Sequence, residues 1–128
     1  MKKRNLMTIA LLGLAGVSAA LSLTASQGGQ DIPADVLNVF KKNCVRCHTG
    51  PKPPKGLRLI PGKIAAVIDA PSAEVPSLKI IDSNDPEASY LLKKIRRQPD
   101  IAGKPMPPRK ALTAEALQVI EAWIEGLK

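Results

Sequence analysis

Aromatic residues are scarce in this chain of 128 residues, which contains one Phe, one Tyr and one Trp. It has a single histidine, and its two cysteines, Cys44 and Cys47, stand only three positions apart. Such closely spaced thiols would close too short a loop to stabilise a fold, so a disulfide scaffold is excluded. The shortage of aromatic side chains also leaves a small domain with a thin aromatic core.

The N-terminal segment is typical of a secretory signal. Met1-Lys2-Lys3-Arg4 is basic, and the run from Leu6 to Leu23 is apolar or small throughout. Small residues suited to cleavage occur within the run at Val17-Ser18-Ala19 and directly after it at Thr24-Ala25-Ser26. An uncleaved membrane anchor is the alternative, because this run of about 18 residues reaches the lower limit for a membrane span.

These patterns divide the chain into a signal peptide or anchor, a polar linker and one domain, at residues 1–26, 27–32 and 33–128. We expect the domain to reside in the periplasm or another extracytoplasmic compartment. Membrane attachment is expected only if the N-terminal segment stays uncleaved.

The pentapeptide Cys44-Val45-Arg46-Cys47-His48 has the spacing C-x-x-C-H, the attachment signature of a c-type haem. Two thiols at this spacing can each add to one vinyl group of the same porphyrin. The adjacent histidine is then held under the ring, where its imidazole can bind the iron. The sequence therefore predicts one covalent haem c, with Cys44 and Cys47 as thioethers and His48 as the proximal iron ligand.

Two other uses of closely spaced cysteines fit the sequence less well. A thioredoxin-like redox pair opens a helix after a strand, whereas here a helical pattern precedes the motif and Pro51, Pro53 and Pro54 follow it. A structural zinc site needs four ligands, and no second Cys/His cluster exists in the chain.

Apolar periodicity of the helical type occurs in several places, and no stretch has a convincing strand pattern. The first helix is expected to have Asp31 as its cap and to lead into Cys44. Its apolar face is spaced i, i+3, i+4, i+7 and consists of Pro33, Val36, Leu37 and Phe40. The fold class predicted from these patterns is all-α.

The second clear helix is expected to begin at Asp85-Pro86 and to end at Pro99. Its buried face is expected to hold Ala88, Leu91, Leu92 and Ile95. The basic residues outside that face are Lys93, Lys94, Arg96 and Arg97.

The last helix is expected after the cap Thr113. Its apolar face consists of Leu117, Ile120, Ile124 and Leu127, with Trp123 close by. A short helix is expected at Ile64, Val67 and Ile68, and loops at residues 49–55, 72–81 and 100–112.

Met106 is the leading candidate for the second axial ligand. His48 is the only histidine, and the other methionines, Met1 and Met7, lie in the expected signal. Prolines on both sides of Met106 restrict its loop, which lowers the cost of holding a thioether against the iron. A lysine ligand and a vacant position are the alternatives.

The order of these elements resembles the class I cytochrome c fold, with Phe40 and Trp123 placed like the aromatic pair where its first and last helices cross. The chain is also similar to planctomycete-type cytochrome c domains over most of residues 33–127. The matching segments are Gly56-Leu57-Arg58-Leu59, Asp85-Pro86 with Ser89 and Leu92, Met106-Pro107-Pro108, and Trp123-Ile124. The resemblance implies a small fold wrapped around one covalent haem.

A His/Met iron has no open position for a substrate, so we expect a monohaem electron carrier and not an enzyme. No second histidine is present for acid–base work. The alternative is a haem-based sensor, in which Met106 dissociates to admit a gas, or a haem subunit of a larger redox enzyme complex.

The charge balance favours acidic partners. The formal net charge is +8, and loss of Lys2, Lys3 and Arg4 with the signal would lower it to +5. A basic carrier is expected to meet redox partner proteins through an acidic docking surface. Export and the scarcity of aromatic residues argue against a nucleic-acid partner.

Overall fold

The structure, a computed structural model, describes residues 31–128. The expected signal peptide and linker positions 27–30 lie outside the described residues. All regular elements of the described part are helical and none is a β-strand, in agreement with the predicted class. Its elements in chain order are α1 (Ala34–Asn43), η1 (Pro54–Gly56), η2 (Ile64–Val67), η3 (Pro86–Ala88), α2 (Tyr90–Ile95) and α3 (Ala114–Glu125), where η denotes a 3-10 turn.

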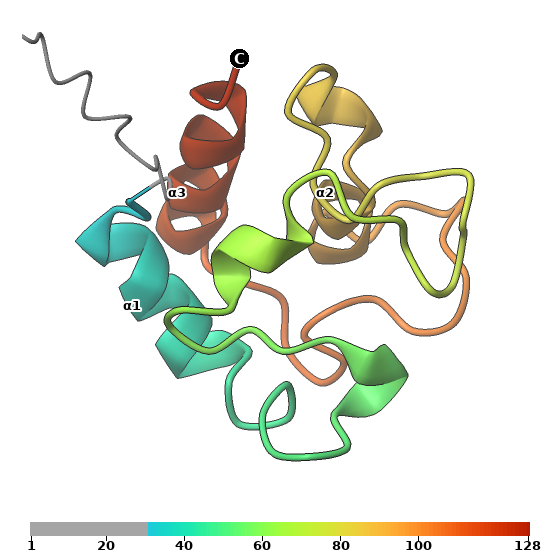
Figure 1. Cartoon of the computed structure of the whole chain (residues 1–128), viewed down its shortest axis with the longest axis horizontal. Helices are drawn as coiled ribbons and strands as arrows, with labels where there is room; N and C mark the ends of the chain where they lie inside the picture. Colours follow the sequence, from blue (N-terminus) through green and yellow to red (C-terminus); the bar gives the residue numbers. More distant parts are fainter. Residues whose placement is uncertain (1–30) are drawn as a thin grey trace, which may run out of the picture.

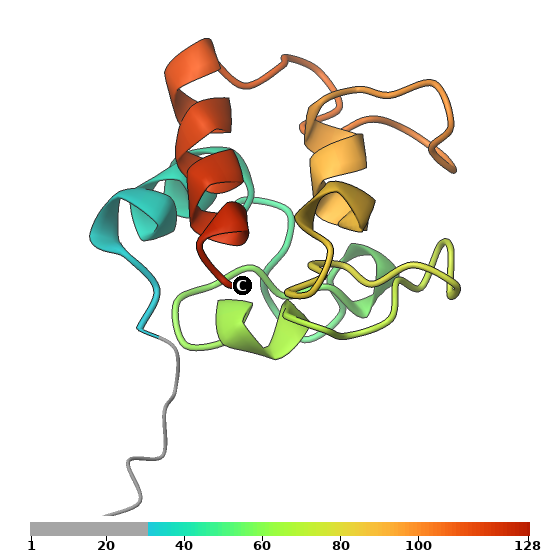
Figure 2. The ribbon, with the colours of Figure 1, turned by 90° about the horizontal axis from the view of Figure 1, so that it is seen from above.

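Helices α1 and α3 pack side by side, and α2 lies across the molecule from them (Figure 1, Figure 2). Phe40 of α1 and Trp123 of α3 meet edge to face, with ring centroids 6.0 Å apart and an interplanar angle of 89°. This geometry suits the ring quadrupoles. The aromatic pair expected from the sequence is therefore confirmed, and it fixes α1, which leads into the cysteine motif. None of the helices in residues 31–128 is long and apolar enough to cross a bilayer.

The start of α1 differs from the prediction, whereas that of α3 agrees with it. Pro33, and not Asp31, holds the cap position of α1, and its carbonyl accepts the first helical bond from the Leu37 amide at 3.0 Å. The extended ψ of 145° at Pro33 places Asp31 upstream of the first turn. In α3 the Thr113 hydroxyl accepts from the Ala116 amide, as its sequence position predicts.

The single helix predicted from Asp85 is wrong, because the chain forms η3 and α2 with an extended residue, Ser89, between them. The Tyr90 and Leu91 amides donate to the carbonyls of Lys79 and Ile80, each at 2.9 Å. These bonds come from a distant segment and replace the helical bonds that would cross Ser89. Pairing with residues 79–80 thus divides the helix.

The segment after η2 also departs in part from expectation. The short helix at Ile64–Val67 is confirmed as a 3-10 turn, but Ile68 lies beyond it and forms an isolated bridge with Ile81. Residues 72–81 contain no helix, as predicted. Two ion pairs join the residues on either side of this loop. The Lys79 ammonium lies 2.8 Å from Asp69, which precedes the loop, and 2.9 Å from Asp82, which follows it.

Asp69→Asn tests the contribution of the Lys79–Asp69 ion pair to stability. Asn is the suitable replacement because it tolerates the left-handed backbone at this position, where φ is 57°. Hydrogen bonds from Lys79 and Ser83 lower the pKa of Asp69 from 3.8 to about 2. A carboxyl whose pKa is lowered on folding stabilises the fold above its unfolded pKa, and that stabilisation disappears as the pH falls toward 2. We expect denaturant unfolding to show a less stable variant at pH 7 and a smaller difference from wild type at pH 2. An equal difference at both pH values would contradict this.

Candidate functional site

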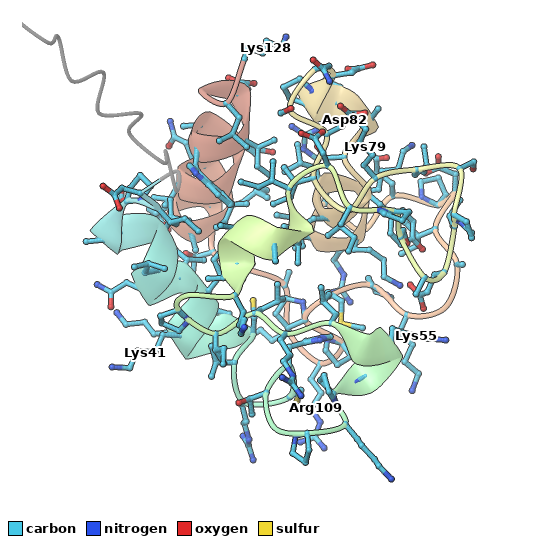
Figure 3. The ribbon with its side chains drawn as sticks, viewed as in Figure 1. Lys41, Lys55, Lys79, Asp82, Arg109 and Lys128 are labelled. Atoms are coloured by element: carbon cyan, nitrogen blue, oxygen red, sulfur yellow. The ribbon has the colours of Figure 1, made fainter. Side chains whose placement is uncertain are left out.

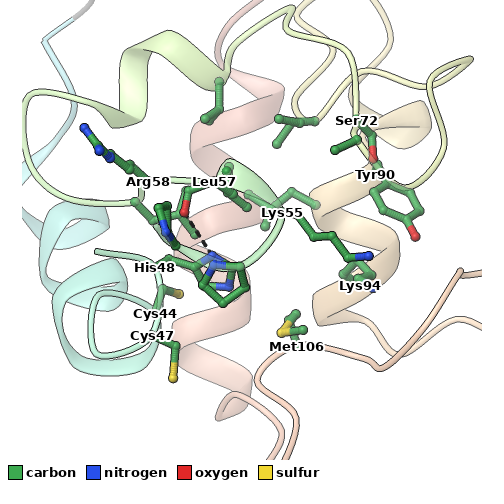
Figure 4. Close-up of a pocket in the computed structure, with 18 of the residues that line it drawn as sticks. Cys44, Cys47, His48, Lys55, Leu57, Arg58, Ser72, Tyr90, Lys94 and Met106 are labelled. Carbon is green, nitrogen blue, oxygen red and sulfur yellow. Dashed lines mark hydrogen bonds between the residues drawn. The ribbon is translucent and has the colours of Figure 1, made fainter. Parts of the chain in front are cut away.

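The cysteine motif forms a tight turn directly after α1. Cys44 caps the helix, and its amide donates to the Phe40 carbonyl at 2.8 Å. The Cys44 carbonyl in turn accepts from the amides of Cys47 and His48, at 3.2 and 3.0 Å. The turn therefore keeps both sulfurs and the imidazole close together, as Figure 4 shows.

His48 is fixed in orientation and in tautomer. Its ring Nδ1 lies 3.1 Å from the Leu57 carbonyl oxygen. A carbonyl only accepts hydrogen bonds, so Nδ1 is the donor, and in a neutral imidazole Nε2 then has the lone pair. The His48 carbonyl also accepts from the Leu59 amide at 2.9 Å. His48 is 9% exposed, and with this orientation it could bind a metal through Nε2.

A cavity of about 750 Å³ lies beside the motif, within the range of about 300–1,000 Å³ that cofactor sites occupy. Its walls come from the motif, the segment from Pro51 to η2, the loop of residues 70–80, α2 and the loop before α3. The apolar residues in these walls include Leu57, Leu59, Val67, Ile80, Leu91 and Ile95. Helix α3 does not line it but supports α1 from behind.

Met106 lies across this cavity from the cysteine motif (Figure 4). Its amide donates to the Lys94 carbonyl at 3.0 Å, and the Arg97 guanidinium donates to the Pro107 carbonyl at 3.0 Å. The long loop before α3 is therefore fastened to α2 at Met106 itself. The structure brings all four site residues predicted from the sequence, Cys44, Cys47, His48 and Met106, to one cavity.

The two thiols differ in environment. Cys44 is half-buried, and burial raises its pKa from 9.0 to about 11, whereas Cys47 is exposed. Redox-active and nucleophilic cysteines depend on a lowered pKa, because the thiolate is the reactive form. The raised pKa of Cys44 therefore gives no support to a thioredoxin-like role for this pair.

The lining of the cavity matches the groups that a haem requires. It offers two thiols on one side, the free Nε2 of an imidazole and a thioether across from it, with apolar walls between. Lys55, Arg58 and Lys63 also line it and match the charge of the two carboxylates that a haem carries. The residues present fit this group in donor chemistry, size and charge.

Three polar residues of the cavity wall, Glu74, Tyr90 and Lys94, were not singled out from the sequence. Lys94 was expected outside the buried face of its helix, but it is only 6% exposed. It lies three residues after Leu91 and four after Tyr90, so helical spacing puts it on the cavity side of α2. That spacing is the signal that would have identified it.

Comparisons of the chain with protein-family models, curated proteins and solved structures found no match. Within residues 31–128, no group of three or more His, Cys, Asp or Glu side chains is placed to hold a metal ion.

Proposed function

We propose that the protein is a monohaem c-type cytochrome that carries electrons between partner proteins outside the cytoplasm. The observation that supports this best is the convergence of Cys44, Cys47, His48 and Met106 on one apolar cavity of about 750 Å³. Each of these residues has the chemistry that a covalently attached haem with two axial ligands requires.

In this proposal Cys44 and Cys47 would hold the cofactor permanently, and His48 Nε2 and the Met106 sulfur would bind its iron. The bound haem supplies one-electron redox chemistry. With both positions filled by protein, no coordination site remains for a substrate, which favours a carrier over an enzyme. Thioether ligation raises the reduction potential, and apolar walls strengthen that effect by excluding water.

The rigidity of the ligand residues supports electron transfer in particular. His48 is held through its ring and its carbonyl, and Met106 through its own amide. A pre-arranged site needs little movement when its charge changes. The crossing of α1 and α3 at Phe40 and Trp123, with the cysteine motif directly after α1, further supports a class I cytochrome c fold.

The distribution of charge supports an acidic partner. Residues 36–68 and 101–114, which supply the motif and the Met106 loop, contain no acidic residue. Their basic residues, all exposed, are Lys41, Lys42, Arg46, Lys52, Lys55, Arg58, Lys63, Lys104, Arg109 and Lys110. Among the described residues, only Lys55 of this set forms an ion pair, a 3.9 Å contact with Glu74. We call these ten residues the basic face.

Covalent attachment is tested by mass. Produced in a host that matures c-type cytochromes, the denatured chain should carry the extra mass of one haem, because thioether bonds survive unfolding. Cys44→Ala and Cys47→Ala should each weaken attachment, whereas Ser72→Ala, also at the cavity wall, should leave it intact. A wild-type mass equal to that of the bare polypeptide would refute the proposal.

Axial ligation is tested by Met106→Ala. Oxidised wild type should show the weak far-red band of sulfur–iron coordination, and the variant should lack it. The variant should also have a lower reduction potential and bind carbon monoxide when reduced, because the vacated position becomes accessible. An unchanged spectrum and potential would show that Met106 is only a packed loop residue.

The role of the basic face is tested at an electrode coated with a carboxylate-terminated monolayer, which imitates an acidic partner. The electron-exchange rate should fall as ionic strength rises, because salt screens the attraction. Arg109→Glu, on the basic face, should slow exchange more than Lys128→Glu, which changes net charge equally but lies at the opposite end of the molecule (Figure 3). Equal effects of the two substitutions would contradict a localised docking face.

A further inference from the structure

An ion pair lies in the cavity wall beside Met106. The Lys94 ammonium is 2.6 Å from the Glu74 carboxylate, and their side chains are only 7% and 16% exposed. The same ammonium donates to the Ala102 carbonyl at 2.7 Å. Lys94 therefore joins three separate segments: the loop that carries Glu74, helix α2, and the loop before α3.

Tyr90 completes this arrangement from one turn earlier in α2. Its hydroxyl lies 3.2 Å from Glu74 Oε2, to which it donates, and it accepts from the Ala102 amide at 3.0 Å. The Lys94 ammonium also lies 5.5 Å from the centroid of the Tyr90 ring, within range of a cation–π contact. In the described part of the chain no buried side-chain polar atom lacks a partner, so this network is fully satisfied.

The network bears directly on the position of Met106. Ala102, held through both its amide and its carbonyl, precedes Met106 by four residues. The backbone carbonyl of Lys94 accepts the Met106 amide at 3.0 Å. Lys94 thus fixes the loop at two points, with its side chain at Ala102 and with its main chain at Met106. Figure 4 shows Tyr90, Lys94 and Met106 on the same side of the cavity.

We propose that Glu74, Lys94 and Tyr90 are positioning residues that keep the Met106 thioether against the iron and so exclude external ligands. This inference depends on the proposed ligation by Met106. A long loop would otherwise lose conformational entropy each time the sulfur bound. Because the network orders residues 102–106 during folding, that cost is met before coordination.

Glu74 makes the arrangement possible. A lysine this deeply buried needs an opposite charge, and the Glu74 carboxylate supplies it. Without Glu74, the Lys94 ammonium gains by moving toward water, which breaks its bond to Ala102. We therefore expect loss of either charge to release the loop, even though neither side chain touches the iron in the proposed site.

A second ion pair on the same helix provides a matched control. Arg96 Nε lies 2.6 Å from Glu121 of α3, the same distance as in the Lys94 pair. This pair joins α2 to α3 and includes no residue of the loop from Ala102 to Met106. A substitution there disturbs the fold without acting on Met106.

The experiment compares Lys94→Met and Glu74→Gln with Glu121→Gln in the full haem-loaded protein. Lys94→Met and Glu74→Gln should weaken the far-red sulfur–iron band, and the reduced variants should bind carbon monoxide at least tenfold faster than wild type. Hydrogen exchange of the Met106 amide should also accelerate. Glu121→Gln should lower only the thermal midpoint.

The double variant Lys94→Met/Glu74→Leu separates positioning from general stability. It replaces the buried pair with apolar groups, so the thermal midpoint should recover toward wild type. Carbon monoxide binding should remain fast, because the Ala102 carbonyl still lacks its ammonium donor. Recovery of slow binding together with stability would overturn the positioning role.

The remaining outcomes distinguish the two levels of the proposal. A wild-type protein without the far-red band would refute ligation by Met106 itself. The positioning role alone would be refuted by a different result, in which the wild type shows the band. In that result, Lys94→Met or Glu74→Gln would bind carbon monoxide no faster than Glu121→Gln.

Discussion

An apolar cavity of about 750 Å³ is the constraint on which this fold depends. Protein interiors are close-packed, and an unfilled apolar space of this size forfeits both dispersion contacts and burial. With one Phe, one Tyr and one Trp, the chain has few aromatic side chains with which to fill it. A covalently attached haem would provide the missing apolar volume, so the same group would complete the core and perform the redox chemistry.

Helices and loops have different roles around this cavity. The contact of Phe40 with Trp123 makes α1 and α3 a rigid support, and the cysteine motif follows α1 directly. Loops supply His48's partner Leu57 on one side and Met106 on the other. Loops are more mobile than the helices that they connect, so each of these is held by a specific hydrogen bond. The Leu57 carbonyl bonds the His48 imidazole, and the Met106 amide donates to the Lys94 carbonyl. In the proposed function, the exposed basic residues of the same segments form the docking surface.

Local patterns predicted the first and last helices and a set of residues that the structure brings to one cavity, because these depend on nearby residues. Thr113 caps α3 as expected, and Cys44, Cys47, His48 and Met106 line one cavity. The predictions failed where distant segments compete with local ones. Bonds from Tyr90 and Leu91 to residues 79–80 divide the second helix, and a partner 20 residues away in the sequence, Glu74, allows Lys94 to be buried. No single-segment pattern contains that information.

The visible spectrum of the purified protein, oxidised and then reduced, tests the central claim most directly. Expressed in a host that matures c-type cytochromes, the protein should show a strong Soret band. On reduction, the sharp α and β bands of a six-coordinate haem c should appear, and carbon monoxide should leave them unchanged. A colourless protein that is nevertheless folded would contradict the account, because the fold would then form without a haem.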